Sequence, residues 1–425
     1  MSAPTKESET ASRQACRRAE ILTTAASCCG VTGETALTDS AIILLYLTSL
    51  GEGNTGSLIS TSLLPLFNGL AVIPMAVLAP RFGVRVLVLT ACAVSSLGYL
   101  AAGTAAWIGG GAATVLWGVT CAALVQAGFI AGWFPLLNSF LTSENRVSFL
   151  GRMRFFHQLC ATVFVLLAGW FIGGGNNAGR LQLVVLLAAL IFCGRFFCIL
   201  AVPKFPEERR TGFSGWTDLK QAASNRSLLR FSIYQFIFNA GSFGVVPLAL
   251  LYLKKSGLPD NITVIVSGGS FVGMMLGYWF IRDLTARFGE RWTVIFLCIV
   301  SLPGIAAFYL LRSCPGTAQC ILLTVLLGGI SFAVAAFSVI SSAVVMACAG
   351  KENTSMTMAF GNAFYYGSAG LTRAVISWAA GSAWFEAMKN GFAGSGFGMI
   401  FLISGGIMTA ALLLAPVFLR PENRP

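Results

Sequence analysis

Twelve long apolar runs make up most of this sequence of 425 residues. Each run is long enough to cross a bilayer as a helix, which takes about 20 mostly apolar residues. Helices are expected rather than open strands because a segment in lipid must satisfy its own backbone hydrogen bonds. The sequence therefore predicts an all-α polytopic membrane protein. The runs lie at residues 24–49, 57–79, 85–107, 111–140, 155–174, 181–202, 229–253, 262–282, 292–312, 318–349, 357–383 and 396–419.

The charged residues support a membrane protein and indicate its orientation. Only 10% of the residues are charged, too few to cover the surface of a soluble protein of this size. If the N-terminus lies inside, the inner segments hold 21 of the 28 lysines and arginines and the outer segments hold five. This asymmetry predicts cytoplasmic termini in a plasma (inner) membrane. Because the basic residues form short clusters between spans and not one face, no nucleic-acid binding is expected.

The polar segments divide the chain. Residues 1–20 lack the apolar core of a signal peptide and are expected to form a cytoplasmic tail. The longest polar stretch, 203–228, leaves six spans on each side and is interpreted as a cytoplasmic linker. The expected domains are therefore an N-terminal six-helix bundle at 1–202 and a C-terminal six-helix bundle at 229–425.

Within the linker, apolar residues recur at every third position. Phe213, Trp216 and Leu219 form this pattern. The spacing is typical of an amphipathic turn on the inner membrane surface. A plain tethered linker is the alternative.

Two short patterns occur twice at one offset. "RFGVR" at Arg81–Arg85 is matched by "RFGER" at Arg287–Arg291, and "LLYLTSLG" at Leu44–Gly51 is matched by "LLYLKKSG" at Leu250–Gly257. Both pairs are 206 residues apart. Two anchors at one offset predict two copies of a six-helix unit, and internal repeats of this kind are found in transporters.

The repeated charged turn resembles the signature loop of the major facilitator superfamily, which reads roughly G-x-x-x-D-R-x-G-R-R. It follows the second span and recurs after the eighth, and the resemblance covers the whole chain in topology. The loop's aspartate position holds Pro80 and Ala286, and its leading glycine position holds Ala76 and Arg282. The resemblance implies twelve spans in two pseudo-symmetric six-helix bundles, with spans 1, 4, 7 and 10 lining a central cavity.

The two turns are candidate gate loops. Glycine permits a chain reversal that a side chain would oppose, and arginines could hold the inner ends of the bundles together. The alternative is a topology anchor that keeps the loop inside. In the second copy, an aspartate three residues before the family's position is the available substitute. The candidate gate residues are Arg81, Gly83, Arg85, Asp283, Arg287, Gly289 and Arg291.

Two acids lie inside the first span, where a charge is costly and usually functional. The offset of 206 places Ala240 opposite Glu34 and Val245 opposite Asp39, so neither acid is repeated. A carboxylate in the cavity could carry a proton, because burial favours its neutral form. The alternative is an acid that faces the outer mouth or forms a structural pair.

Two arginines also fall within spans. Arg373 lies deep in span 11, where it could bind an anionic substrate or pair with an acid such as Glu34. Arg195 lies nearer the inner end of span 6 and is expected to extend its charge to the inner surface as a structural residue. His157, the only histidine, is either a pH sensor or a packed side chain.

Three amide side chains lie on the presumed cavity helices. Gln126 is on span 4, and Gln235 and Asn239 are on span 7. They could donate hydrogen bonds to a substrate. They could equally bond between helices, as amides in membrane proteins often do.

The sequence thus favours a secondary active transporter that moves a small polar or anionic solute by alternating access, with proton symport as a candidate coupling. We expect no enzyme activity, cofactor or metal site, since there is one histidine, the cysteines are scattered and embedded acids are few. The expected partners are the solute, protons and the bilayer, and the chain is expected to act as a monomer. The alternatives are a multidrug/proton antiporter, although span 5 lacks the proline found in that branch, and a sensor on the same fold.

Overall fold

Every regular element of the computed structural model is a helix in the part of the chain that it describes. The described residues are 6–141, 143–173, 178–205, 215–311, 316–348, 354–382 and 396–419.

The first half of the chain begins with a broken rod. An α-helix passes into one π-helical turn and restarts as a second short helix, and five further helices follow. The elements are α1 (Lys6–Glu34), η1 (Thr35–Asp39), α2 (Ala41–Ser49), α3 (Asn54–Phe82), α4 (Val84–Thr104), α5 (Gly111–Asn138), α6 (Ser143–Ile172) and α7 (Ala178–Leu200).

The second half follows the same plan after a short connecting helix, α8. Its first rod is also broken, between α9 and α10. The elements are α8 (Gly215–Ser224), α9 (Arg226–Ser242), α10 (Val245–Lys255), α11 (Asp260–Leu310), α12 (Thr317–Ala347), α13 (Thr354–Ala380) and α15 (Gly396–Phe418).

Long apolar helices dominate both halves. Of the helices in the described ranges, nine are long and apolar enough to cross a membrane, or ten if the bent pair of 13–39 and 41–49 counts as one span. One of the nine, α11, has 51 residues and is divided by a non-helical residue, Gly289, into two rods. With this division, and with the 27-residue α13, each of the twelve predicted spans corresponds to a helical rod.

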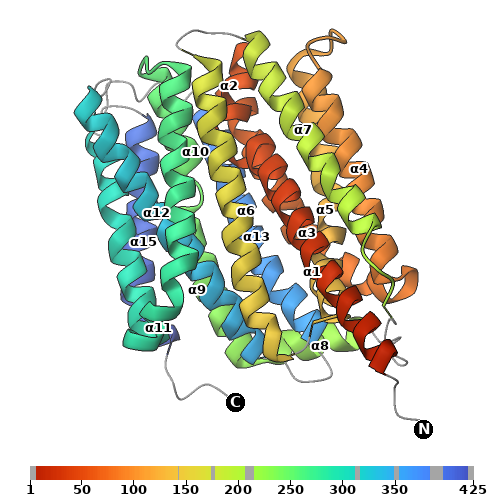
Figure 1. Ribbon diagram of the computed structural model, residues 1–425. Helices are drawn as coiled ribbons and strands as arrows, with labels where there is room; N and C mark the ends of the chain where they lie inside the picture. Colours follow the sequence, from red (N-terminus) through yellow and green to blue (C-terminus); the bar gives the residue numbers. More distant parts are fainter. Residues whose placement is uncertain are drawn as a thin grey trace.

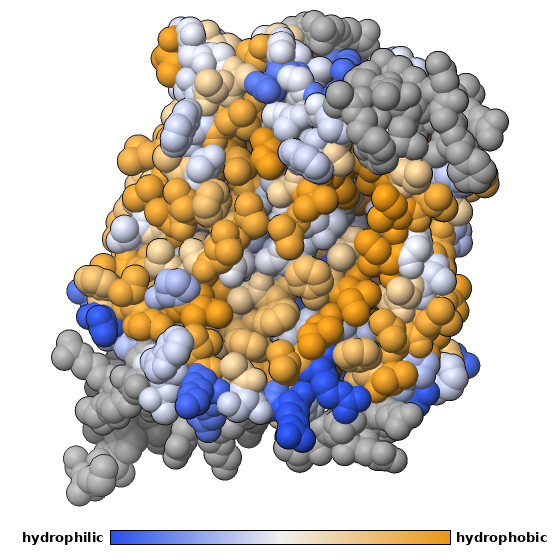
Figure 2. Space-filling view, turned by 180° about the vertical axis from the view of Figure 1, so that it is seen from behind, coloured by the Kyte–Doolittle hydropathy of each residue, from blue (hydrophilic) through white to orange (hydrophobic). Residues whose placement is uncertain are grey.

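The rods run between two ends of the molecule, and the start of α1 and the end of α15 lie at the same end (Figure 1). On the face that Figure 2 shows, the surface between these ends is largely apolar and hydrophilic groups gather near the ends. This distribution is expected of a protein surrounded by lipid, because only the ends meet water. The predicted all-α membrane fold is confirmed.

The two halves meet along two helix pairs, α3 with α13 and α6 with α11. At the first pair, a Cβ atom on Gly69 would lie 2.4 Å from the Cα atom of Gly367. A Cβ atom on Gly370 would lie 2.2 Å from the backbone nitrogen of Leu66. These glycines let the backbones of α3 and α13 approach closely, as small residues do at helix interfaces in membranes.

The two repeated sequence patterns have repeated structures. Gly83 (φ 87°, ψ 135°) and Gly289 (φ 73°, ψ 162°) share a backbone conformation that L-residues rarely adopt. The "LLYL" patterns lie in α2 and α10, which both follow the break in their rod. Each helix is followed two residues later by a glycine with positive φ, Gly51 (φ 85°) and Gly257 (φ 94°). The repeat predicted from two short patterns therefore extends to the breaks in spans 1 and 7.

The connecting helix α8 lies in the predicted linker and packs against α9 and α13. Trp216 is 78% exposed, whereas Leu219 packs against the core. Phe213 lies outside the described residues. The helical form and the two-sided exposure agree with the amphipathic interpretation for Trp216 and Leu219.

Candidate functional site

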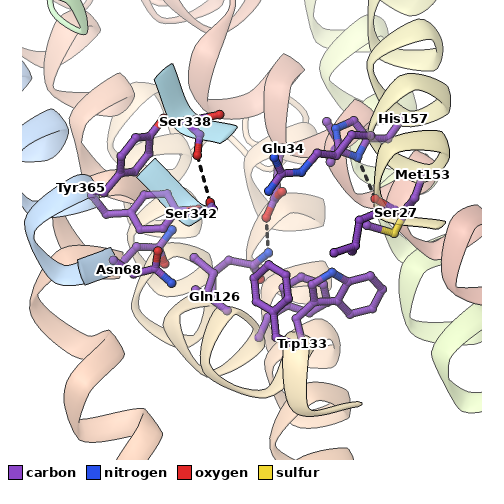
Figure 3. A pocket seen from close by; sticks show the side chains of 18 of the residues that line it. Ser27, Glu34, Asn68, Gln126, Trp133, Met153, His157, Ser338, Ser342 and Tyr365 are labelled. Atoms are coloured by element: carbon purple, nitrogen blue, oxygen red, sulfur yellow. Dashed lines mark hydrogen bonds between the residues drawn. The ribbon is translucent and has the colours of Figure 1, made fainter. Parts of the chain in front are cut away.

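A cavity of about 310 Å³ lies between the two halves. Its lining comes from α1, α3, α5, α6 and α7 of the first half and from α11, α12 and α13 of the second (Figure 3). Spans 1, 4 and 10 contribute as expected. Span 7 does not line this cavity, but its break lines a second one of about 210 Å³, which shares Tyr278, Tyr365 and Tyr366 with the first.

Glu34 lies in the larger cavity and forms an ion pair with Arg195. The guanidinium donates from Nη1 to Oε1 at 3.0 Å and from Nη2 to Oε2 at 3.1 Å, a bidentate arrangement. Gln126 donates from Nε2 to Oε1, the contact drawn in Figure 3. Ser95 in turn donates to Oε1 of Gln126 at 3.2 Å. The network joins α1, α4, α5 and α7 inside the first half.

The prediction that Arg195 extends to the inner surface is wrong. The side chain is 2% exposed, and its guanidinium carbon lies 4.2 Å from the centre of the Phe129 ring and 5.0 Å from that of Phe192. A Cβ atom on Gly30 would lie 1.5 Å from Nε, so only a glycine leaves room for the guanidinium. Arg195 stays buried because the carboxylate of Glu34 supplies its counter-charge within the protein.

Arg373 forms the second embedded ion pair, with Asp39. The distance from Nη2 to Oδ1 is 2.6 Å. Arg373 also donates from Nε to the backbone oxygen of Phe243 at 3.0 Å and from Nη1 to that of Thr61 at 2.9 Å. The predicted pairing with an acid is found, but the partner is Asp39 and not Glu34.

This second pair joins the two halves. Arg373 is on α13, whereas Asp39 and Thr61 belong to η1 and α3 of the first half. Phe243 lies at the break between α9 and α10. The Asp39–Arg373 ion pair therefore lies on the side of Glu34 that faces α2 and α10, away from the end where α1 begins (Figure 1).

One π-helical turn connects the two acids. Glu34 precedes η1, and Asp39 is its last residue. Thr38 donates its hydroxyl to the backbone oxygen of Glu34 at 2.7 Å, and the hydroxyl of Ser40 accepts from the backbone N–H of Ile42 at 3.2 Å to start α2. π-helical turns are rare and occur frequently at functional sites.

Comparison with known proteins agrees with this architecture. The family model for the Major Facilitator Superfamily matches residues 24–372. The chain belongs to the major facilitator superfamily. No curated protein matches the chain in sequence. Members of this superfamily are transporters, so membership indicates a transporter rather than an enzyme.

Solved structures of superfamily members resemble the chain over nearly its whole length. A mutant of the nucleoside transporter NupG has a TM-score of 0.70 at 13% identity, covering 96% of this chain and 100% of NupG. FucP, a superfamily transporter in the outward conformation, has a TM-score of 0.63 at 14% identity, covering 93% and 98%. A mutant of the E. coli fucose:proton symporter FucP has a TM-score of 0.57 at 14% identity, with the same coverage. At these identities the likeness supports the fold alone.

The superfamily's signature turn binds within its own half in the first copy. Arg85 donates to the backbone oxygens of Leu200 at 3.0 Å and Pro203 at 3.3 Å, at the C-terminal end of α7. Arginine is favourable there because a helix C-terminus carries partial negative charge. These bonds favour the anchor interpretation for Arg85 over a bond between bundles.

The remaining gate candidates lie at the same end of the molecule. Arg81, Asp283 and Arg287 are exposed, and Asp283 is 3.4 Å from the neighbouring Arg282. Arg291 stacks over the adjacent Trp292 ring at 5.8 Å. The structure thus brings the turn residues of both halves to the end of the molecule where α1 begins, and the gate role stays a prediction.

The amides of span 7 bond between helices. Gln235 donates to the backbone oxygen of Gly361 at 3.0 Å and accepts from the hydroxyl of Ser341. Asn239 donates to the hydroxyl of Ser368 at 3.1 Å. Both amides are 0% exposed, which favours the structural alternative for them. Only Gln126 of the three predicted amides lines the larger cavity.

The sequence did not single out several cavity residues. Asn68 on α3 is 3% exposed and lines the cavity, and its Oδ1 atom has no hydrogen-bond partner among the described residues. The wall from the second half is neutral and polar. A serine or an asparagine on an apolar helix gives no sequence signal that separates a binding residue from a bond between helices. The residues of this wall that the sequence did not single out are Tyr278, Ser338, Ser341, Ser342 and Asn362. Tyr365 and Tyr366 also belong to it, and their place near the start of span 11 did indicate a lining role as the alternative to interface aromatics.

Two basic residues of α6 also line the cavity. The guanidinium carbon of Arg154 lies 5.8 Å from the centre of the Tyr278 ring, across the boundary between the halves. His157 shares a hydrogen bond of 2.9 Å with the hydroxyl of Ser27 through Nδ1 (Figure 3). Arg154 precedes the apolar run of span 5, so the sequence places it with the basic residues of the inner segments. The packed alternative for His157 agrees with this contact.

Proposed function

We propose that this protein is a secondary active transporter that moves a small polar or anionic solute across the membrane by alternating access. One observation carries the proposal: a cavity lined by both polar and apolar side chains lies between the two halves, and an ion pair between the halves, Asp39–Arg373, lies on one side of it. Such a tie must open if the halves rock about a central site. The names of the structural neighbours, a nucleoside transporter and a fucose:proton symporter, support a small polar solute with proton symport.

The distribution of basic residues supports an orientation for this tie. With 21 lysines and arginines in the segments on the side of the termini and five on the other, the termini belong in the cytoplasm. The Asp39–Arg373 pair then lies towards the outside of a plasma (inner) membrane. On this orientation the structure represents a state that is closed outwards.

An anionic solute is supported by a different arginine from the one that the sequence indicated. The charge of Arg373 is balanced by Asp39. Arg154 lines the cavity, and among the described residues no carboxylate forms an ion pair with it. The cavity lining contains two arginines and one acid, Glu34, so its charge is positive. Positive charge favours an anion over a cation in a cavity with apolar walls.

Transport in proteoliposomes tests the proposal. A cysteine is placed on α2 at Thr48 and another on α10 at Lys254, in a background without native cysteines; the two helices pack together at this point. A reversible thiol cross-linker across the pair should stop solute uptake and the accompanying proton movement, and reduction should restore both. Uptake that continues at the same rate when the outer ends are cross-linked would contradict alternating access.

A further inference from the structure

The carboxylate of Glu34 lies on Arg195 in the way that a bound carboxylate ligand would. Both oxygens accept from the two Nη atoms, at 3.0 and 3.1 Å, and the planar fork of a guanidinium matches a carboxylate in this arrangement. Both residues line the cavity between the halves. Glu34 is 18% exposed and Arg195 only 2%, so the carboxylate covers the guanidinium.

Arg195 needs an anion whatever else occupies the cavity. A guanidinium remains charged at any ordinary pH. Its other neighbours are the aromatic rings of Phe129 and Phe192, which compensate a full charge poorly, and its Nε atom has no hydrogen-bond partner among the described residues. A state in which Glu34 leaves and nothing replaces it is therefore strongly disfavoured.

We propose that Arg195 is the binding site for the carboxylate of a small organic monoanion, and that Glu34 fills this site until it takes up a proton and the solute replaces it. The proposal rests on the transport function proposed above. It goes beyond that function by naming the class of solute, the atoms that bind it and the group that carries the proton.

The coupling follows from charge. If the solute bound while Glu34 stayed ionised, two carboxylates would compete for one guanidinium and repel each other. If Glu34 took up a proton alone, Arg195 would be left without a counter-charge. The proton and the anion are therefore favourable only together. The proton adds to the Glu34 carboxylate, the solute carboxylate accepts from Nη1 and Nη2 of Arg195, and the net charge of the site does not change.

Glu34 is the only carboxylate in the described lining of the cavity, so it is the group available to take the proton. The groups that face it are polar or basic. Neutral Glu34 could still accept from Gln126 Nε2, which stays in place. The titratable and charged groups around it come from α4, α6, α7, α11 and α13: Cys92, Tyr99, Arg154, His157, Arg195, Tyr278, Tyr365 and Tyr366.

The shape of the cavity narrows the class further. Its volume of about 310 Å³ is at the lower end of the range for small-molecule sites, roughly 300–1,000 Å³. Phe129 and Trp133 are stacked with ring centres 4.9 Å apart, and both line the cavity beside Arg195. Asn68 and Ser342 present polar groups from other helices (Figure 3). A planar ring that carries one carboxylate fits these walls, so benzoate is a suitable probe.

Calorimetry on the purified protein in detergent tests the site without any transport step. Benzoate should bind the wild type at about pH 6, and its affinity should fall by up to roughly tenfold per pH unit towards about pH 8, because one proton is bound with it. Benzamide, which has the same shape and no charge, should not bind measurably. In Glu34→Gln the internal carboxylate is absent, so benzoate should bind at least tenfold more tightly than to the wild type at about pH 8, with little dependence on pH.

A matched control is Glu20→Gln, which removes an acid from the same helix outside the cavity lining and should keep the wild-type pH dependence. The proposal is overturned if benzoate binds neither protein, if Glu34→Gln binds no better than the wild type, or if benzamide binds as well as benzoate. Should Glu34→Gln not fold, the pH dependence and the benzamide comparison in the wild type decide the matter.

These outcomes are separate from the failure of the transport function. Benzoate binding without flux in proteoliposomes would remove the transporter proposal and keep the site. Uptake of a neutral solute without proton movement would keep the transporter proposal and remove the proposed coupling at Arg195 and Glu34.

Discussion

Two acid–arginine pairs begin on the first span, one at each end of the same π-helical turn, and they connect different parts of the molecule. Glu34–Arg195 joins α1 to α7 inside the first half. Asp39–Arg373 joins η1 to α13 across the two halves. The acids also differ in exposure: Glu34 is 18% exposed and Asp39 is 37% exposed.

The difference indicates which pair can open during transport. A pair within one half need not change when the halves move as rigid bodies, so Glu34–Arg195 can be exchanged for a solute while the bundle stays intact. Under the alternating access proposed above, a pair between halves must break in each cycle. Partial exposure of Asp39 lowers the cost of breaking it, because water can solvate the separated carboxylate. Because η1 connects Glu34 to Asp39, the exchange at Arg195 and the breaking of the Asp39–Arg373 pair would take place on neighbouring residues of the chain.

The largest effect on stability is expected from breaking the Glu34–Arg195 pair. Arg195→Leu leaves the carboxylate of Glu34, which is only 18% exposed, without a counter-charge, and the free energy of unfolding should fall by about 3–5 kcal/mol. Chemical unfolding in detergent measures the loss. The double variant Glu34→Leu with Arg195→Leu removes both charges and should recover most of it. A double variant as unstable as the single one would show that the arginine acts through packing and not through the pair.

Breaking the Asp39–Arg373 pair is expected to reduce stability less but to change the conformation more. Arg373→Ala removes one ion pair and two hydrogen bonds from a charged donor to backbone oxygens, and should cost about 1.5–3 kcal/mol. Spin labels on Thr48→Cys and Lys254→Cys, in a background without native cysteines, should report a wider distance between α2 and α10.

The control for this experiment is Arg373→Lys, which keeps the charge and loses the fork. It should give a distance between the wild type and Arg373→Ala. If the label distances are the same in all three proteins, the Asp39–Arg373 pair does not hold the outer ends together, and the contrast between the two pairs disappears.

The smallest effect on stability is expected at the repeated turns. Both halves contain this turn and neither ion pair involves it, so its cost is a reference for the cost of breaking either pair. Gly289→Ala introduces a side chain at φ 73°, and a Cβ atom there would meet nothing within 4 Å. The cost is backbone strain alone, of order 1 kcal/mol in the free energy of unfolding, because φ 73° with ψ 162° is a region almost confined to glycine. Gly316→Ala is the matched control, since its φ is −71° and its Cβ atom would also meet nothing within 4 Å. Equal stability of the two variants would show that the turn conformation is not constrained.

Much of the frame could be predicted from the sequence. The twelve apolar runs correspond to helical rods, and the doubled "RFGxR" pattern marks two turns with the same backbone at Gly83 and Gly289. The cavity was harder to predict. The two embedded acids could be found because charges are rare in spans, whereas Asn68 could not, since a single polar amide in an apolar run has many possible partners.

What the sequence determined by itself is local: where each span lies, where the chain turns, and that one unit is used twice. These features depend on the thickness of the bilayer and on the φ angle of single residues, and both act over a few residues. Only the tertiary structure decided which arginine meets which acid. Glu34 and Arg195 are 161 positions apart, and Arg373 reaches Thr61 over 312. A lipid-facing side and a core-facing side of a helix are both apolar, so the pattern of residues does not reveal how each rod is rotated, and the rotation places the charges.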